Sequence, residues 1–235
     1  MRLVNCSVGK CRKLQFSKIL RSNAKPIWDK IYAHPYLKEF GDGTLSISKF
    51  KYFLQQDHIY VVEYCRPLAI AISKADSAEE MKWFADLIIG GLTWEAKNEE
   101  MLAEMIGMSY GELTSAIQSP TSRAYSDFLV QVASTGTVAE FIASMSPCML
   151  TYPEIGRMLK PKKGLDKVSA YRAWTDFYAS DEAWAFAKQF DDKLDVLGET
   201  ESSNVKNKMS KNFLIASRYE YMFWDMAYKE EKWLV

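Results

Sequence analysis

The sequence predicts an all-α protein, folded as a single helical bundle of seven to eight helices. Apolar residues recur at spacings of three and four from one end of the 235-residue chain to the other. Glycine is scarce, with 11 residues, and no stretch shows the alternation of a half-buried strand. Since 48% of the residues are hydrophobic, the chain can fill a sizeable core.

The first expected helix covers residues 16–33, with its apolar residues on one inner face. The stretch "AHPYLKEFGDGTLS" follows, and its proline and glycines predict a break. A second, long helix is expected from Ser48 to the turn near Asp76. Pro67 lies well inside it, and the missing amide hydrogen should bend the helix there.

Capping residues mark two of the later helix starts. Ser77 with Glu80, and Thr137 with Glu140, have the spacing of a capping box. Another helix over 121–134 lies between these starts, and three more are expected over 166–179, 181–197 and 202–232. No shift in composition marks a domain boundary, so we expect one helical domain over 16–235 and an N-terminal tail over 1–15.

Charge and composition exclude several classes of function. Thirty basic and thirty acidic residues cancel, and no basic run suggests a nucleic-acid partner. No apolar run approaches the roughly 20 residues that span a bilayer. Four cysteines in a chain of this length, none spaced as CxxC, do not form a disulfide framework. We therefore expect a cytoplasmic protein with reduced thiols and a small-molecule partner.

Two carboxylates interrupt apolar stripes that should face the core. In the long second helix, steps of three and four residues give Phe53, Asp57, Tyr60, Tyr64 and Leu68. In the last helix they give Phe213, Ala216, Glu220, Phe223 and Ala227. An unpaired buried carboxylate is costly, so both positions call for bonding partners or a polar cavity. For either residue alone, a structural hydrogen bond is the more common explanation.

A cysteine faces inward from a third helix. In "SMSPCMLTYPEIG" the same steps give Met145, Cys148, Tyr152, Ile155 and Leu159. Pro147 and Pro153 each remove a helical hydrogen bond, and the resulting kink should widen the bundle beside the thiol. Alternatively, Cys148 is a small buried apolar residue and the kink only curves the helix. A thiol, two carboxylates and tyrosines facing inward are nevertheless the set expected of a nucleophile with acid–base partners.

Metal and haem sites are not indicated. The chain has two histidines, His34 and His58, and neither completes the Glu-x-x-His pairs of a di-iron bundle. His34 lies in a turn and His58 is one residue off the inward stripe, so neither is placed as a haem ligand. The "GGLTWE" stretch has no preceding strand and is not a phosphate-binding loop.

Three separated blocks of sequence identify a family. They are "HPYLKEFGDGTLSISKFKYFLQQDHIYVVEY", "PCMLTYPEIG" and "YEYMFWDMAY". With these blocks in this order, the chain from about Phe16 to Trp233 resembles the thiaminase II family, also called TenA. The resemblance implies a haem-oxygenase-like fold, a homotetramer, and no metal or organic cofactor. The first fifteen residues have no place in the family pattern, and the methionine and threonine after Cys148 replace bulkier residues.

The resemblance also implies roles for the inward residues. Cys148 corresponds to the family's nucleophile and Glu220 to its acid–base carboxylate, whose pKa should be raised in a dry setting. Asp57 corresponds to the aspartate that binds the aminopyrimidine ring. The implied aromatic pocket residues are Tyr60, Tyr125, Tyr152 and Tyr178.

The implied activity is hydrolysis of thiamine or of 4-amino-5-aminomethyl-2-methylpyrimidine, in thiamine degradation and salvage. The shared product is 4-amino-5-hydroxymethyl-2-methylpyrimidine. One rival hypothesis is a non-catalytic pyrimidine-binding or regulatory protein on the same fold, although the sequence has no basic recognition helix. Another is a relative with oxidative chemistry, against which the missing Glu-x-x-His pairs count.

Overall fold

The computed structural model describes residues 15–235, so the expected N-terminal tail lies outside the described residues except for Gln15. The described part contains helices and no strands. The α-helices are α1 Phe16–Tyr32, α2 Pro35–Asp42, α3 Ile47–Lys74, α4 Ala78–Gly90, α5 Ala96–Met105, α6 Tyr110–Thr114, α7 Pro120–Thr135, α8 Val138–Leu159, α9 Ser169–Tyr178, α10 Asp181–Thr200 and α11 Ser203–Lys229. A π-helical segment, η1, covers Gly91–Glu95, and a 3₁₀ segment, η2, covers Lys163–Lys167.

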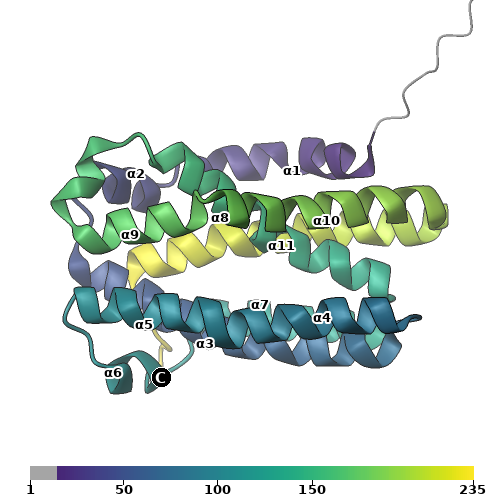
Figure 1. Cartoon of the computed structure of the whole chain (residues 1–235), viewed down its shortest axis with the longest axis horizontal. Coiled ribbons are helices and arrows are strands. Elements are labelled where there is room, and N and C mark those ends of the chain that lie inside the picture. The colour runs from purple at the N-terminus through teal and green to yellow at the C-terminus, as the bar shows by residue number, and fades with distance from the viewer. Residues whose placement is uncertain (1–14) are drawn as a thin grey trace, which may run out of the picture.

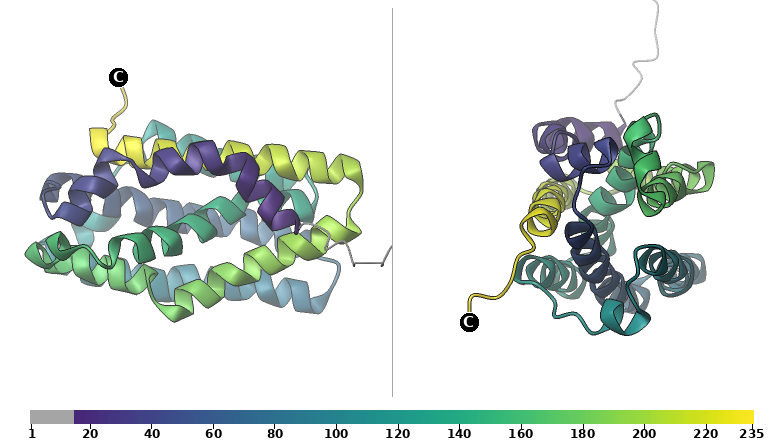
Figure 2. Two further views of the ribbon diagram at one scale, coloured as in Figure 1. Left: turned by 90° about the horizontal axis from the view of Figure 1, so that it is seen from above. Right: turned by 90° about the vertical axis from the view of Figure 1, so that its left-hand side faces the viewer.

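The all-α prediction is confirmed, and eight of the helices match the expected ones to within a few residues. The additional α-helices, α2, α5 and α6, are short. The long helices run along the long axis of the molecule, and α4 and α5 follow each other along one line (Figure 1). The views from above and from the end show the same bundle (Figure 2).

The predicted break after the first helix is confirmed, because α1 ends at Tyr32, but the stretch that follows also contains a helix that was not expected, α2 over Pro35–Asp42. His34 caps this helix, and its Nδ1 accepts a hydrogen bond from the Tyr36 amide at 3.1 Å. Pro35 occupies the first turn, where no amide hydrogen is needed, and Gly43 ends the helix in the left-handed conformation with φ of 64°. The proline and the glycine therefore mark the two ends of a helix rather than a loop.

The two predicted helix starts at Ser77 and Thr137 are confirmed. The hydroxyl of Ser77 accepts from the Glu80 amide at 3.1 Å, and that of Thr137 from the Glu140 amide at 3.2 Å. The reciprocal bond of a full capping box does not form at Ser77, because the Glu80 carboxylate accepts from the Asp76 amide instead.

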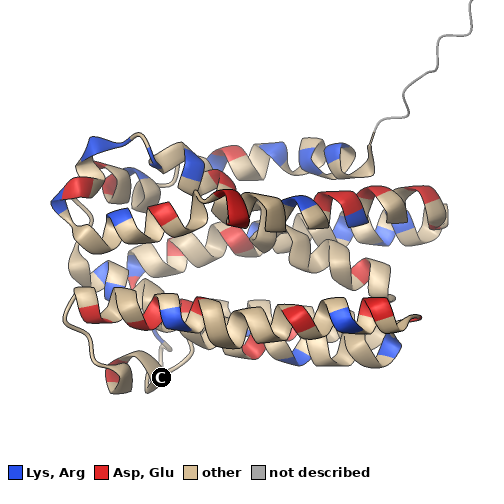
Figure 3. Ribbon diagram, viewed as in Figure 1, with Lys and Arg blue, Asp and Glu red and all other residues tan. Residues whose placement is uncertain are grey.

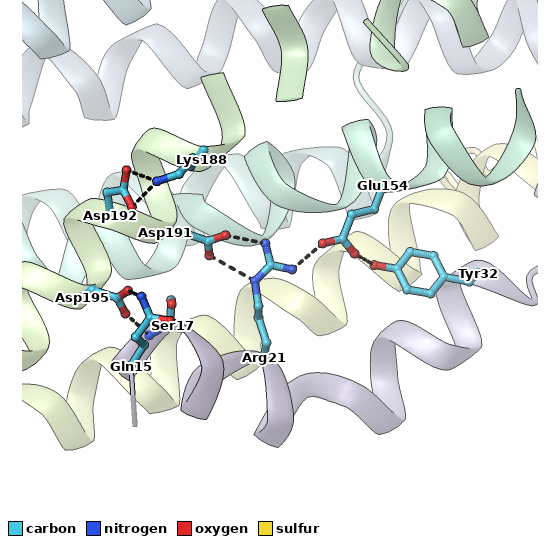
Figure 4. Close-up of polar contacts among 9 residues, drawn as sticks. All are labelled: Gln15, Ser17, Arg21, Tyr32, Glu154, Lys188, Asp191, Asp192 and Asp195. Atoms are coloured by element: carbon cyan, nitrogen blue, oxygen red, sulfur yellow. Dashed lines mark hydrogen bonds and ion pairs between the residues drawn. The ribbon is translucent and has the colours of Figure 1, made fainter. Parts of the chain in front are cut away.

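Arg21 of α1 ties together α8 and α10 (Figure 4). Its guanidinium donates to both carboxylate oxygens of Asp191, at 3.0 and 2.9 Å, and to Glu154. The Tyr32 hydroxyl donates to the same Glu154 carboxylate. Since Glu154 lies two residues after Tyr152, this half-buried network fixes the part of α8 on which the predicted site depends.

Helices α8 and α11 lie at the centre of the packing. α11 packs against α8, α1, α3 and α7, while α8 also contacts α9 and α10. The helices with the inward cysteine and the inward glutamate are therefore direct neighbours. Within residues 15–235, no helix combines the length and apolar character needed to cross a bilayer.

Candidate active site

All three inward stripes lie in the interior, as predicted from their spacing. Asp57 of α3 is 4% exposed and Glu220 of α11 is 1% exposed, although both are carboxylates. Cys148 of α8 is half-buried, and its side chain lines a cavity. The three polar residues come from helices far apart in the sequence, and the bundle brings them into one region.

The cavity has a volume of about 250 Å³ and lies between α3–α4 on one side and α8–α10 on the other. Its lining includes five of the predicted site residues: Asp57, Tyr60, Cys148, Tyr152 and Tyr178. The other two, Tyr125 and Glu220, lie outside this lining and are both buried. The structure therefore divides the predicted set into two groups: five residues that line the cavity, and the buried pair Tyr125 and Glu220.

The buried pair is a carboxylate with a tyrosine. The Tyr125 hydroxyl donates to Glu220 Oε1 at 2.7 Å. Burial raises the pKa of Glu220 from 4.5 to about 7, and the Tyr125 hydroxyl and the Cys148 thiol limit this rise. A carboxyl group with a pKa near neutral is suited to accepting and returning a proton.

The thiol of Cys148 is surrounded by groups that oppose its ionisation. Burial raises the pKa of Cys148 well above 9.0, and the nearby carboxyl groups of Glu220, Glu95 and Asp57 raise it further. The adjacent Tyr60 hydroxyl acts in the opposite direction. The thiol is therefore protonated in the empty cavity, and a nucleophilic role requires a base that takes its proton as the sulfur attacks.

Asp57 faces the cavity without a partner from the protein. None of the hydrogen bonds found among residues 15–235 involves its carboxylate. Burial raises the pKa of Asp57 well above 3.8, and the neighbouring carboxyl groups of Glu99, Glu95 and Glu220 contribute to the rise. Such a group is free to bond to a ligand, and a cationic or hydrogen-bond-donating ligand would stabilise its ionised form.

Aromatic rings form much of the cavity wall. The ring of Tyr60 stacks on Tyr125 with centroids 5.1 Å apart, and its hydroxyl is buried without a partner among the described residues. The ring of Tyr152 lies 5.4 Å from Trp224 and 5.1 Å from Tyr178. Flat rings at these positions suit a planar heteroaromatic ligand.

Gly156 explains how Tyr178 reaches the cavity. A Cβ atom at Gly156 would lie 2.6 Å from the Ala179 amide nitrogen and 2.7 Å from the Tyr178 carbonyl carbon. Only glycine therefore lets the end of α9 approach α8 this closely. The sequence stretch that carries Cys148 thus also sets the position of the tyrosine opposite.

Tyr64 also lines the cavity; the period of α3 predicted it to face inward, although not as a site residue. Sequence reasoning missed two glutamates near the cavity. Glu95, at the end of η1, lines the cavity and accepts a hydrogen bond from Tyr178 at 2.9 Å, and Glu99 of α5 shares a 2.7 Å hydrogen bond with His58 Nδ1. The π-helical turn shifts the register of "TWEAKNEE", so a regular helical period does not place these residues.

The family of this chain follows from its similarity to known proteins. A family model described as TENA/THI-4/PQQC matches residues 21–230. The chain belongs to this family. It is 36% identical over 220 residues to the aminopyrimidine aminohydrolase of Halalkalibacterium halodurans, covering 94% of this chain and 98% of that protein. With the Bacillus subtilis protein of the same name, identity is 31% over 223 residues, covering 94% and 92%.

Solved structures agree with the assignment to the TENA/THI-4/PQQC family. A TenA homologue from P. horikoshii OT3 superimposes with a TM-score of 0.82 at 27% identity, covering 92% of this chain and 99% of that one. Heme oxygenase 2 from Chlamydomonas reinhardtii gives a TM-score of 0.63 at 15% identity, covering 90% and 96%. The second likeness shows the fold alone, and it confirms the expected haem-oxygenase-like class.

Proposed function

We propose that this member of the TENA/THI-4/PQQC family hydrolyses aminopyrimidines with Cys148 as nucleophile and Glu220 as acid–base group. The observation that carries the proposal is the combination of a cavity-lining thiol, a buried carboxyl with a pKa of about 7 beside it, and an unpaired carboxylate opposite. The two relatives named aminopyrimidine aminohydrolase support the substrate class. The substrates are thiamine and 4-amino-5-aminomethyl-2-methylpyrimidine, and the product is 4-amino-5-hydroxymethyl-2-methylpyrimidine.

Binding comes first in the proposed mechanism. The pyrimidine ring lies between the rings of Tyr60 and Tyr152, with Tyr178 and the Tyr125–Glu220 pair completing its surroundings. Asp57 accepts hydrogen bonds from the amidine part of the ring, that is, from the amino group and the protonated ring nitrogen next to the aminated carbon. This bond favours the protonated ring, which is the more electrophilic form.

The chemical steps use Cys148 and Glu220, which lie on the neighbouring helices α8 and α11. Glu220 takes the thiol proton while the sulfur of Cys148 adds to the electron-poor ring. Glu220 gives this proton to the ring or to the departing amine as ring electrons expel the leaving group from the methylene carbon. The carboxylate then takes a proton from the water that adds to this carbon, and it returns that proton to the sulfur as the sulfur leaves the ring and the thiol is regenerated. This sequence needs no group that the described side chains do not provide.

Hydrolysis of the two pyrimidines by the purified full-length protein tests the proposal. We expect the hydroxymethylpyrimidine to form from at least one of them, in proportion to the protein added. Tight binding of the pyrimidine without product would favour a non-catalytic binding protein instead. If the protein neither bound the pyrimidines nor formed the product, both hypotheses would be excluded for these ligands.

Replacement of Asp57 by asparagine should chiefly weaken substrate capture. The change keeps the side-chain shape and exchanges an anionic acceptor for a neutral amide. A hydrogen bond to a charged group is worth roughly 1.5 to 3 kcal/mol, so kcat/KM should fall by about tenfold to a few hundredfold. Steady-state kinetics measure this, and an unchanged kcat/KM would remove Asp57 from the site.

Activity should also depend on the ionisation of Glu220. The group must be a carboxylate to accept the thiol proton, and its pKa of about 7 means that kcat/KM falls as the pH drops below neutral. Thiamine is the substrate of choice for this profile, because the charge of its thiazolium does not titrate. A profile that stays flat from pH 8 to pH 5 would contradict the role of Glu220.

The same proposal includes a homotetramer in the cytoplasm. Large apolar side chains are exposed along α4, η1 and α5, and they support an interface between copies of the chain. They are Met81, Ile89, Leu92, Trp94, Met101 and Met105. The small-molecule pyrimidine is the other partner.

A further inference from the structure

Two carboxyl–tyrosine pairs flank the thiol of Cys148. One is Glu220 with Tyr125, bonded at 2.7 Å and outside the cavity lining. The second is Glu95 with Tyr178, bonded at 2.9 Å, and both of its members line the cavity. The charge of either glutamate raises the pKa of Cys148, which shows that both lie close to the sulfur. The proposed mechanism uses the first pair and gives Glu95 no role.

The charged residues of the cavity lining all have the same sign. They are Asp57, Asp86, Glu95 and Glu182, and no lysine or arginine belongs to the lining within residues 15–235. Along the helices as a whole, by contrast, basic and acidic residues are interspersed (Figure 3). Asp86 is paired with Lys82, but Asp57, Glu95 and Glu182 have no basic partner among the described residues and favour a ligand that brings a positive charge.

A second, independent observation points to a ligand beside Glu95. Tyr64 is 5% exposed and lines the cavity, yet its hydroxyl has no hydrogen-bond partner among the described residues. The charges of Cys148 and Glu95 both raise its pKa, so the hydroxyl lies near both groups. An unpaired buried hydroxyl costs free energy unless a bound molecule supplies the missing bond.

The outer part of the cavity is aromatic. Trp94, one residue before Glu95, is 75% exposed, and Phe177 and Phe186 also contribute to the lining. Aromatic faces attract cations, and this attraction is stronger where the cation is partly desolvated. Asp57 is 4% exposed and lines the same cavity, so the ring of one substrate can bond to Asp57 while its leaving group lies toward Glu95 and Trp94.

We propose that Glu95, oriented by Tyr178, binds the positively charged nitrogen of the substrate's leaving group. This nitrogen is an ammonium in the aminomethylpyrimidine and part of the thiazolium ring in thiamine. The inference rests on the proposed function and makes the site selective for pyrimidines with a cationic group on the methylene carbon. Holding the nitrogen as a cation matters chemically. When the carbon–nitrogen bond breaks, its electron pair then stays on the nitrogen of a neutral amine or thiazole.

The state of Glu95 in the empty cavity agrees with this assignment. Burial raises the pKa of Glu95, and the hydrogen bond from Tyr178 offsets part of the rise. A cation placed beside the carboxylate would favour its ionised form.

Calorimetric binding to the Cys148→Ser protein with and without Glu95→Gln tests the inference, because the serine prevents turnover of the aminomethyl ligand. The ligands are the aminomethylpyrimidine and the neutral hydroxymethylpyrimidine, which share the same ring. Glutamine keeps an oxygen that accepts from Tyr178, so only the charge is lost. We expect affinity for the aminomethyl ligand to fall about tenfold or more, and affinity for the hydroxymethyl ligand to stay within about twofold. Glu104→Gln is the matched control, an exposed glutamate on α5 outside the cavity, and should change neither affinity.

The outcomes separate this inference from the proposed function. Equal loss for both ligands, or no loss for the aminomethyl ligand, would overturn the role of Glu95. If the wild-type protein showed the expected ligand preference but hydrolysed neither substrate, the proposed hydrolysis would fail and the cation site would stand. If the wild-type protein bound neither ligand, both would be overturned.

Discussion

Cys148→Ser should nearly abolish hydrolysis while leaving the protein folded and able to bind the pyrimidine. The substitution changes size and shape little, so the loss of packing should be small. The chemistry changes far more, because a hydroxyl is a much weaker nucleophile and acid than a thiol. Turnover of thiamine and calorimetric binding, measured on the same preparation, separate the two effects.

Cys65→Ser is the matched control for this experiment. Cys65 lies on α3, outside the cavity lining, and its thiol donates to the Val61 carbonyl oxygen at 3.3 Å. A serine can make the same bond, so most of the activity should remain. Cys6→Ser and Cys11→Ser should also keep most activity, since both lie on the expected N-terminal tail. If Cys148→Ser retained more than about a tenth of wild-type turnover, direct activation of water by Glu220 would become the better account.

Glu220→Gln should lower kcat by roughly a hundredfold to ten-thousandfold, the usual contribution of a positioned acid–base group. The amide keeps an acceptor for the Tyr125 hydroxyl but cannot take the thiol proton. Binding of the hydroxymethylpyrimidine should change little by comparison. A kcat within about threefold of the wild type would assign proton transfer to another group.

The same variant should be more stable than the wild type at alkaline pH. The folded-state pKa of Glu220 is raised to about 7 from 4.5, so folding favours the protonated group. The stability that this adds is fully present below pH 4.5 and is lost as the pH rises through 7. Since glutamine stays neutral, Glu220→Gln should gain up to about 3 kcal/mol at pH 8, and the gain should shrink at pH 5. Urea unfolding at the two pH values measures it, and a pH-independent difference would contradict the burial argument.

The sequence predicted the inward stripes because helical period alone decides which residues share a face. Asp57, Cys148 and Glu220 each interrupt an apolar stripe at a spacing of three or four, and all three lie in the interior. Their helices also proved to be adjacent in the bundle. The family resemblance then added the tyrosines, of which Tyr125 and Tyr178 follow no carboxylate-bearing stripe.

Other parts of the site depend on features that a regular period does not contain. Glu95 ends the π-helical segment η1, and the additional residue per turn moves it off the face that a regular α-helix would give. The separation between the cavity wall and the buried Glu220–Tyr125 pair depends on packing between helices, which no local pattern encodes. Similarly, proline and glycine are common both in loops and at the ends of helices, so Pro35 and Gly43 did not by themselves predict α2.

Partitioning of the reaction between water and an added alcohol tests the shared intermediate on Cys148 most directly. Wild-type protein would be incubated with thiamine or with the aminomethylpyrimidine in buffer containing a fixed concentration of methanol. The ratio of methoxymethyl to hydroxymethyl product would then be measured for each substrate. If both leaving groups depart before the second nucleophile attacks, the same Cys148-bound pyrimidine is formed and the two ratios are equal. Ratios that differ between the two substrates would show that water displaces the leaving group directly, and would contradict catalysis through the cysteine.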